Sequence, residues 1–108
     1  MSAALVYITC ADKSEAERVG QALVEANLAA CVNIIDGMQS MFWWQGKAEK
    51  DQETVLLAKT RTALVGDLTE KVRSVHSYDC PCVVALPIID GNPEFLQWIH
   101  DETRNPEA

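Results

Sequence analysis

The pattern of apolar and polar positions divides the chain into strand and helix segments. Residues 4–10 are almost continuously apolar, which predicts a central strand buried on both faces. Two later segments repeat apolar residues at spacings of three and four, which predicts amphipathic helices. The repeating positions are Ala16, Val19, Leu23 and Ala26 in the first helix and Val65, Leu68, Val72 and Val75 in the second. A short apolar strand follows at Cys82–Leu86, and Phe95–Ile99 lies in a last amphipathic helix.

The longest feature is the stretch Cys31–Arg61, which predicts an extended antiparallel hairpin. Two runs of branched and aromatic residues flank a polar tip, Gln45–Asp51, where Gly46 supplies the freedom that a reversal needs. The first arm is expected to be bulged or broken near Asp36-Gly37. An arm of this length exceeds what a core of ~100 residues covers on both faces. We therefore expect its apolar excess to meet another copy of the chain.

Capping residues place the helix and strand ends. Asp12 is expected to cap the first helix, with Glu15 as its capping-box partner. Thr62 is expected to cap the second helix. Pro87 is expected to close the last strand. Asn92 is expected to cap the final helix, because a proline follows it at the first helical position.

The resulting order is strand, helix, strand, strand, helix, strand, with one added helix at the end. This is the split βαβ pattern of the α+β class, a ferredoxin-like βαββαβ sandwich with helices on one face of an antiparallel sheet. The 108 residues suit a single domain, 1–108.

Composition narrows the functional classes. The net charge of −7 opposes binding to nucleic acid and to anionic membranes. No apolar run approaches the ~18 residues of a membrane span, and the amino-terminal segment lacks the features of a secretory signal. We therefore expect a cytoplasmic protein whose four cysteines are free. Because no two of them form a CxxC pair, the sequence does not favour a zinc-ribbon or a thioredoxin-like protein.

Five motifs in register resemble the CutA family, the divalent-cation tolerance proteins. They are CVNII from residue 31, WWQGK from residue 43, VLLAKT from residue 55, VHSYDCP from residue 75, and ALPI with GNPEFLQWI from residue 85. The resemblance covers about residues 4–99. It implies a tightly packed homotrimer of ferredoxin-like subunits, cytoplasmic in bacteria and linked to tolerance of copper and other divalent metals. It also agrees with the long hairpin, since the family joins sheet edges to build its trimer.

The resemblance implies that Cys10 and His76 match residues assigned to copper. A thiolate and an imidazole suit this metal, because Cu(I) favours sulfur and Cu(II) accepts nitrogen. The alternative is that Cys10 is a small, inert core residue. Val75 precedes His76, where family members linked to copper can carry a second histidine.

The other cysteines offer further candidates. Cys31 is the first residue of the predicted hairpin. It is either a further sulfur ligand or a core residue that packs beneath the first helix. Cys80 and Cys82 are two positions apart on the predicted strand, so both side chains would point to the same face and could coordinate one soft metal ion. The alternative is that Cys82 faces the core.

Five polar and aromatic residues are candidates for a cleft or contact between subunits. His76 and Tyr78 could supply a proton acceptor and donor, or else Tyr78 packs and His76 caps helix carbonyls. Trp43 and Trp44, adjacent on a strand, are expected to face opposite sides, with one of them packed on the subunit's own helices. Lys59, a charge in an apolar strand, could pair with an acidic group at a subunit junction or bind a small anion.

Three functions compete on these observations. The first is a trimeric protein of metal-ion tolerance that binds copper or a similar soft metal through Cys10 and His76. The second is a small-ligand sensor like the PII-like signalling trimers, with Lys59, Trp44 and His76 converging in inter-subunit clefts. The third is an enzyme with Cys10 as nucleophile and His76 as base. We expect no enzyme, because the chain has neither a Gly-rich phosphate loop nor a carboxylate pair at catalytic spacing.

Overall fold

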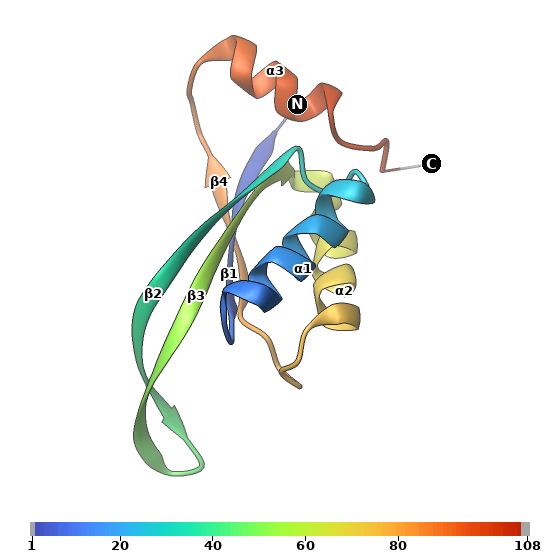
Figure 1. The fold of residues 1–108 in the computed structure, drawn as a ribbon. Coiled ribbons are helices and arrows are strands. Elements are labelled where there is room, and N and C mark those ends of the chain that lie inside the picture. Colours follow the sequence, from blue (N-terminus) through green and yellow to red (C-terminus); the bar gives the residue numbers. More distant parts are fainter. Residues whose placement is uncertain (1, 107–108) are drawn as a thin grey trace.

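The computed structural model describes residues 2–106 and confirms the predicted α+β arrangement. The described chain forms a four-stranded antiparallel sheet and three α-helices (Figure 1). The elements are β1 (Ala3–Cys10), α1 (Lys13–Glu25), β2 (Cys31–Trp44), β3 (Lys47–Arg61), the 3₁₀ turn η1 (Thr62–Leu64), α2 (Val65–Val75), β4 (Val83–Ile88) and α3 (Pro93–Asp101).

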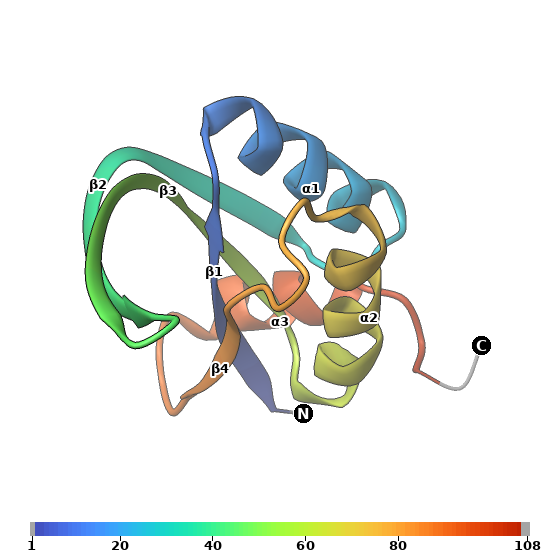
Figure 2. The ribbon, with the colours of Figure 1, turned by 90° about the horizontal axis from the view of Figure 1, so that it is seen from below.

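The strands lie in the order β2-β3-β1-β4, which is the order of a ferredoxin-like sandwich. Strand β1 is central, as predicted, and pairs antiparallel with both β3 and β4. Helices α1 and α2 pack side by side against one face of the sheet (Figures 1 and 2). Helix α3 crosses the end of the sheet at which β1 begins. The added carboxy-terminal helix is thus confirmed.

The core lies between the two helices and the facing side of the sheet. Along β1, Val6, Ile8 and Cys10 are fully buried, whereas the alternating Leu5 and Tyr7 are partly exposed. The expectation of burial on both faces is therefore wrong, because helices α1 and α2 cover one face alone. The other elements contribute Ala16, Val19, Leu23, Leu28, Leu56, Ala58, Leu64, Leu68 and Val72 to the same core.

The hairpin of β2 and β3 turns more tightly than predicted. Gln45 and Gly46 form its two-residue turn, with φ of 50° and 80°. Two consecutive positive φ angles match the right-handed twist of the flanking strands. The polar segment Lys47–Asp51, predicted as part of the tip, instead pairs with residues 40–44 of β2. Its backbone completes the ladder while its charged side chains stay in water.

The predicted irregularity at Asp36-Gly37 is confirmed as a β-bulge. The register between β2 and β3 shifts between Ile35 and Met38, and Gly37 has a φ of 77°. The Asp36 carboxylate accepts hydrogen bonds from the Thr54 hydroxyl at 2.8 Å and from the Gly37 amide at 2.9 Å. A bulge increases the local bend and twist, and the hairpin curls strongly as it leaves the rest of the sheet (Figure 2).

Two of the predicted element ends are confirmed and two are wrong. Asp12 and Asn92 cap α1 and α3 through their side chains. Thr62 does not cap the second helix, because the chain first makes the turn η1 and α2 begins only at Val65. Pro87 does not close β4, which continues to Ile88. β4 is an edge strand, where a missing amide hydrogen is tolerated.

Gly20 in α1 tests how closely this helix approaches the sheet, and Gly66 in α2 serves as the comparison. A Cβ at Gly20 would lie 3.0 Å from Val32 Cγ2 and 3.2 Å from Leu56 Cδ1, whereas one at Gly66 in α2 would meet nothing within 4 Å. We predict that Gly20→Ala lowers the free energy of unfolding by about 1–3 kcal/mol through overpacking. Gly66→Ala should raise it by about 0.4–1 kcal/mol. Urea denaturation measures both, and equal effects would contradict the close approach.

Candidate metal centre

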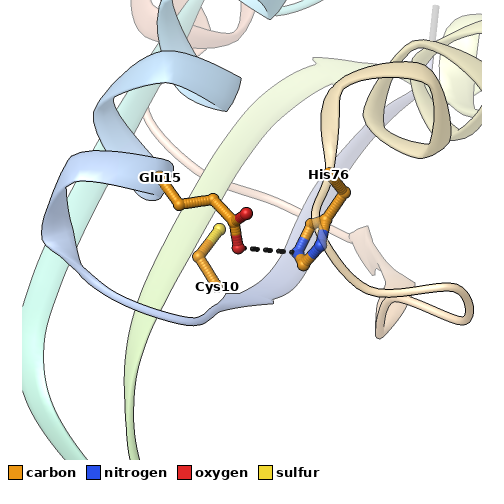
Figure 3. A group of neighbouring side chains, drawn as sticks. All are labelled: Cys10, Glu15 and His76. Atoms are coloured by element: carbon orange, nitrogen blue, oxygen red, sulfur yellow. Dashed lines mark ion pairs between the residues drawn. The ribbon is translucent and has the colours of Figure 1, made fainter.

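Three side chains with different ligand atoms converge where β1 ends. Cys10 is the last residue of β1, Glu15 lies in the first turn of α1, and His76 directly follows α2. The Cys10 thiol, a Glu15 carboxylate oxygen and a His76 ring nitrogen lie within 4.8 Å of one another. Figure 3 shows the three side chains pointing toward a common point from these separate elements. We call this set the Cys10–Glu15–His76 cluster.

The local sequence explains how Glu15 reaches the end of the strand. The Asp12 carboxylate accepts a hydrogen bond from the Glu15 amide at 2.8 Å, which is the helix cap predicted from the sequence. In return, the Glu15 carboxylate accepts a hydrogen bond from the Ala11 amide at 2.9 Å. This reciprocal arrangement resembles a capping box, displaced by one residue. It turns the carboxylate back over the residue that follows Cys10.

Hydrogen bonds fix both nitrogens of the His76 ring. Nε2 lies 2.7 Å from the Thr9 carbonyl oxygen, and Nδ1 accepts a hydrogen bond from the Tyr78 amide at 3.0 Å. A carbonyl only accepts, so Nε2 carries the proton and Nδ1 does not. Nε2 is also 3.6 Å from a Glu15 oxygen, the contact drawn in Figure 3. The alternative that His76 caps helix carbonyls is confirmed for its backbone, since His76 is the C-cap of α2 and its amide donates to the Val72 carbonyl at 2.9 Å, whereas its ring bonds to a strand carbonyl.

Glu15 is a buried carboxylate whose charge is well compensated. Its side chain is 4% exposed. Burial alone would raise the pKa of this carboxyl, but hydrogen bonds from Ala11 and Ser77 outweigh burial and hold its pKa below the usual range. Arg18 adds an ion pair at 3.3 Å. Glu15 is therefore ionised at neutral pH and available as an oxygen ligand.

Cys10 is the opposite case. Its side chain is fully buried, and burial, together with the nearby Glu15 charge, raises the pKa of its thiol to about 12. The thiol is therefore neutral at pH 7 unless a cation displaces its proton. An activated nucleophile needs a lowered pKa, so this environment does not favour the enzyme hypothesis. A metal ion is the kind of partner that deprotonates such a thiol on binding.

Tyr78 closes the cluster from one side. Its ring packs against the His76 ring, with centroids 4.7 Å apart, and its hydroxyl donates to the Glu53 carboxylate at 2.8 Å. Burial and the Glu53 charge raise the pKa of the Tyr78 hydroxyl, which stays protonated. The ring contact matches the alternative in which Tyr78 packs, and a joint role of His76 and Tyr78 in proton transfer stays a prediction.

The remaining candidates lie elsewhere. Lys59 lies beside Cys31, with its Nζ 3.7 Å from the sulfur and 2.6 Å from the Asn33 oxygen, and its cation faces the Phe95 ring at 5.8 Å. Neither residue of this pair belongs to the Cys10–Glu15–His76 cluster. Trp44 pairs with Lys47 at the far end of β3 from Lys59. Within one chain, Lys59, Trp44 and His76 therefore do not converge on one pocket.

Two predictions are wrong: that one of the adjacent tryptophans packs on the subunit's own helices, and that the CPC motif lies on a strand. Trp43 and Trp44 are 78% and 60% exposed, so neither is buried against the helices. The hairpin tip extends away from α1 and α2 (Figure 1). Cys80 and Cys82 precede β4, which begins at Val83. They therefore lie in a loop, where the argument from strand alternation does not apply.

Glu15 is the cluster residue that sequence reasoning missed as a ligand. Its signal was present, since a capping-box glutamate must point back toward the residues before its helix. Here those residues include Cys10. The sequence offered no means of placing His76 beside them.

Fold and site together define the class: a small ferredoxin-like α+β domain with an extended hairpin and a buried Cys-Glu-His cluster. Residues 4–102 match the family model of the CutA1 divalent ion tolerance protein. The chain belongs to this family, as its motifs suggested. In the described residues, none of the helices has the length and apolar character needed to span a membrane.

Relatives and solved structures agree with this assignment. The chain is 46% identical over 92% of its length to the divalent-cation tolerance protein CutA of Thermus thermophilus, covering 96% of it. It is 44% identical over 93% of its length to a chloroplastic CutA protein of Oryza sativa, of which it spans only 56%. The crystal structure of CutA1 from Oryza sativa superposes with a TM-score of 0.94 at 42% identity, covering 96% of this chain and 95% of that one.

The charge on Glu15 is predicted to stabilise the fold in a pH-dependent way. Since its pKa is lowered in the folded state, the contribution is present above the unfolded-state pKa and is lost as pH falls through the folded-state value. Glu15→Gln should lower the free energy of unfolding at pH 7 by roughly 1–3 kcal/mol. The gap to the unsubstituted chain should narrow as the pH is lowered toward 3.

Urea denaturation across this pH range measures the effect, with Glu25→Gln on the exposed side of the same helix as a matched control. A gap that stays constant with pH would show that the charge of Glu15 is not what stabilises the fold.

Proposed function

We propose that this protein acts in tolerance of divalent metal ions by binding copper, or a similarly soft metal, at the Cys10–Glu15–His76 cluster. The observation that carries the proposal is the convergence of a sulfur, a nitrogen and an oxygen ligand within 4.8 Å of one another. Membership of a divalent ion tolerance family supports the role in tolerance. The choice of a soft metal rests on the thiol and the imidazole.

The three ligand groups fit such an ion, but each must first give up an interaction that it makes in the metal-free structure. The Cys10 thiol must lose its proton, and one His76 nitrogen must become free: Nδ1 by parting from the Tyr78 amide, or Nε2 by losing the proton that it shares with the Thr9 carbonyl. The ionised Glu15 would balance part of the metal charge. Because Val75 precedes His76, a second imidazole is missing at this point. The set of three ligands therefore suits low coordination numbers, such as those of Cu(I).

Binding of Cu(I) tests the proposal directly. Anaerobic titration in competition with a chromophoric Cu(I) chelator should show one site per chain. Cys10→Ser should weaken binding by at least tenfold, because it removes the sulfur ligand. His76→Gln should also weaken binding, since an amide can still donate to the Thr9 carbonyl but ligates poorly.

Cys80→Ser removes an exposed thiol from the loop before β4 and serves as the matched control. Equal affinity of the unsubstituted chain and Cys10→Ser would remove Cys10 as a ligand.

We further propose that the protein is a cytoplasmic homotrimer. Met41, Trp43 and Trp44 on the hairpin are 76%, 78% and 60% exposed, and Val84 and Leu86 on β4 are about half exposed. Apolar surface of this extent is typical of a subunit interface. The four unpaired cysteines support a reducing compartment. Relatives differ in location, as the Archaeoglobus fulgidus CutA structure is described as periplasmic.

Sedimentation equilibrium at micromolar concentration should give three times the 11.9 kDa chain mass. Trp43→Glu should lower this mass, because a charge would replace an aromatic ring in the interface. Val24→Glu is the control, since Val24 is also exposed but lies on α1. A folded particle of 11.9 kDa would contradict the trimer.

A further inference from the structure

All three ligand groups are sealed from solvent, although a metal must reach them. The side chains of Cys10 and His76 are fully buried, and that of Glu15 is 4% exposed. Strand β1 and helices α1 and α2 are fixed by the core. The neighbouring segment Ser77–Asp79, by contrast, has no regular secondary structure, and Ser77 and Asp79 are exposed.

This segment blocks two of the three ligand groups with its own backbone. The Ser77 amide donates to Glu15 Oε2 at 3.0 Å, and the next amide, that of Tyr78, donates to His76 Nδ1 at 3.0 Å. Consecutive amides cannot be moved independently. A displacement of the segment would therefore release a carboxylate oxygen and an imidazole nitrogen in one step.

A single side chain ties the segment to the sheet. The Tyr78 hydroxyl donates to Glu53 on β3 at 2.8 Å, and the Tyr78 ring covers the His76 ring. The segment borders an open surface hollow of about 390 Å³, which is lined by Ser77, Tyr78 and Asp79 among others. Outward movement thus has both space and a defined hydrogen bond to break.

We propose that Ser77–Asp79 is a gate over the Cys10–Glu15–His76 cluster, and that the Tyr78–Glu53 hydrogen bond holds it closed. The gate concerns the same site as the proposed metal function and rests on that function for its role. If only the open form binds metal, the apparent affinity equals the affinity of the open form multiplied by the fraction of molecules that are open. Breaking the Tyr78–Glu53 bond should therefore raise thiol accessibility and metal affinity by the same factor.

The test uses Tyr78→Phe, which keeps the ring over His76 and removes the hydroxyl. The first measurement is metal-independent: the rate at which N-ethylmaleimide labels Cys10, followed by peptide mass spectrometry. A hydrogen bond to a charged carboxylate is strong enough for its loss to raise this rate roughly tenfold. Glu53→Ala should act in the same direction. Tyr7→Phe is the matched control, because the Tyr7 hydroxyl contacts Met38 away from the cluster.

The cysteines of the same chain act as internal references. Cys80 is exposed and Cys31 is half-buried beside Lys59, so neither rate should change in Tyr78→Phe. An unchanged Cys10 rate would overturn the gate, and so would equal acceleration at Cys31, which would indicate general loosening. The second measurement is the Cu(I) affinity, which should rise by the factor found for labelling.

The two proposals can fail separately. Faster labelling of Cys10 with no Cu(I) binding in either protein would support the gate and overturn the metal function. Cu(I) binding through Cys10 with no change of labelling rate in Tyr78→Phe would support the metal function and overturn the gate.

Discussion

A buried, ionised carboxylate is the constraint on which this end of the molecule depends. An uncompensated charge in the interior is costly, so Glu15 must collect hydrogen bonds wherever it lies. It obtains them from Ala11, just beyond β1, and from Ser77, just beyond α2. One side chain of α1 therefore joins the ends of a strand and a second helix. The position of His76 beside Cys10 is a consequence of this junction.

The same compensation sets the conditions under which the proposed metal site could bind an ion. Each ligand atom already has a structural role: the His76 ring bonds to Thr9 and Tyr78, and the Cys10 thiol is a buried part of the core. A metal must exchange these interactions for its own bonds. The free energy of binding is therefore the difference between the metal–ligand bonds formed and the existing interactions lost. A strong set of ligands can for this reason still give modest affinity. This balance also means that the cluster is stable without an ion.

The sequence predicted the fold well where local chemistry decides the structure. The caps at Asp12 and Asn92 and the bulge at Asp36-Gly37 follow from side chains that bond to their own backbone. The predictions failed where tertiary context overrides local preference. The polar residues 47–51 are strand because β2 pairs with them, and Pro87 is tolerated because β4 lies at an edge.

The candidate site shows the same division between local and long-range information. The helix cap and the back-pointing Glu15 could be predicted from a spacing of three residues. The approach of His76 could not, because it depends on where the end of α2 lies against β1, more than sixty positions away in the chain. The hairpin shows a related limit on what can be predicted from the sequence. Its apolar excess was evident from Trp43 and Trp44, yet composition could not show that neither ring packs on the subunit's own helices. Beyond the bulge no helix of the described residues covers the two strands, and this uncovered apolar surface is the physical basis of the proposed trimer.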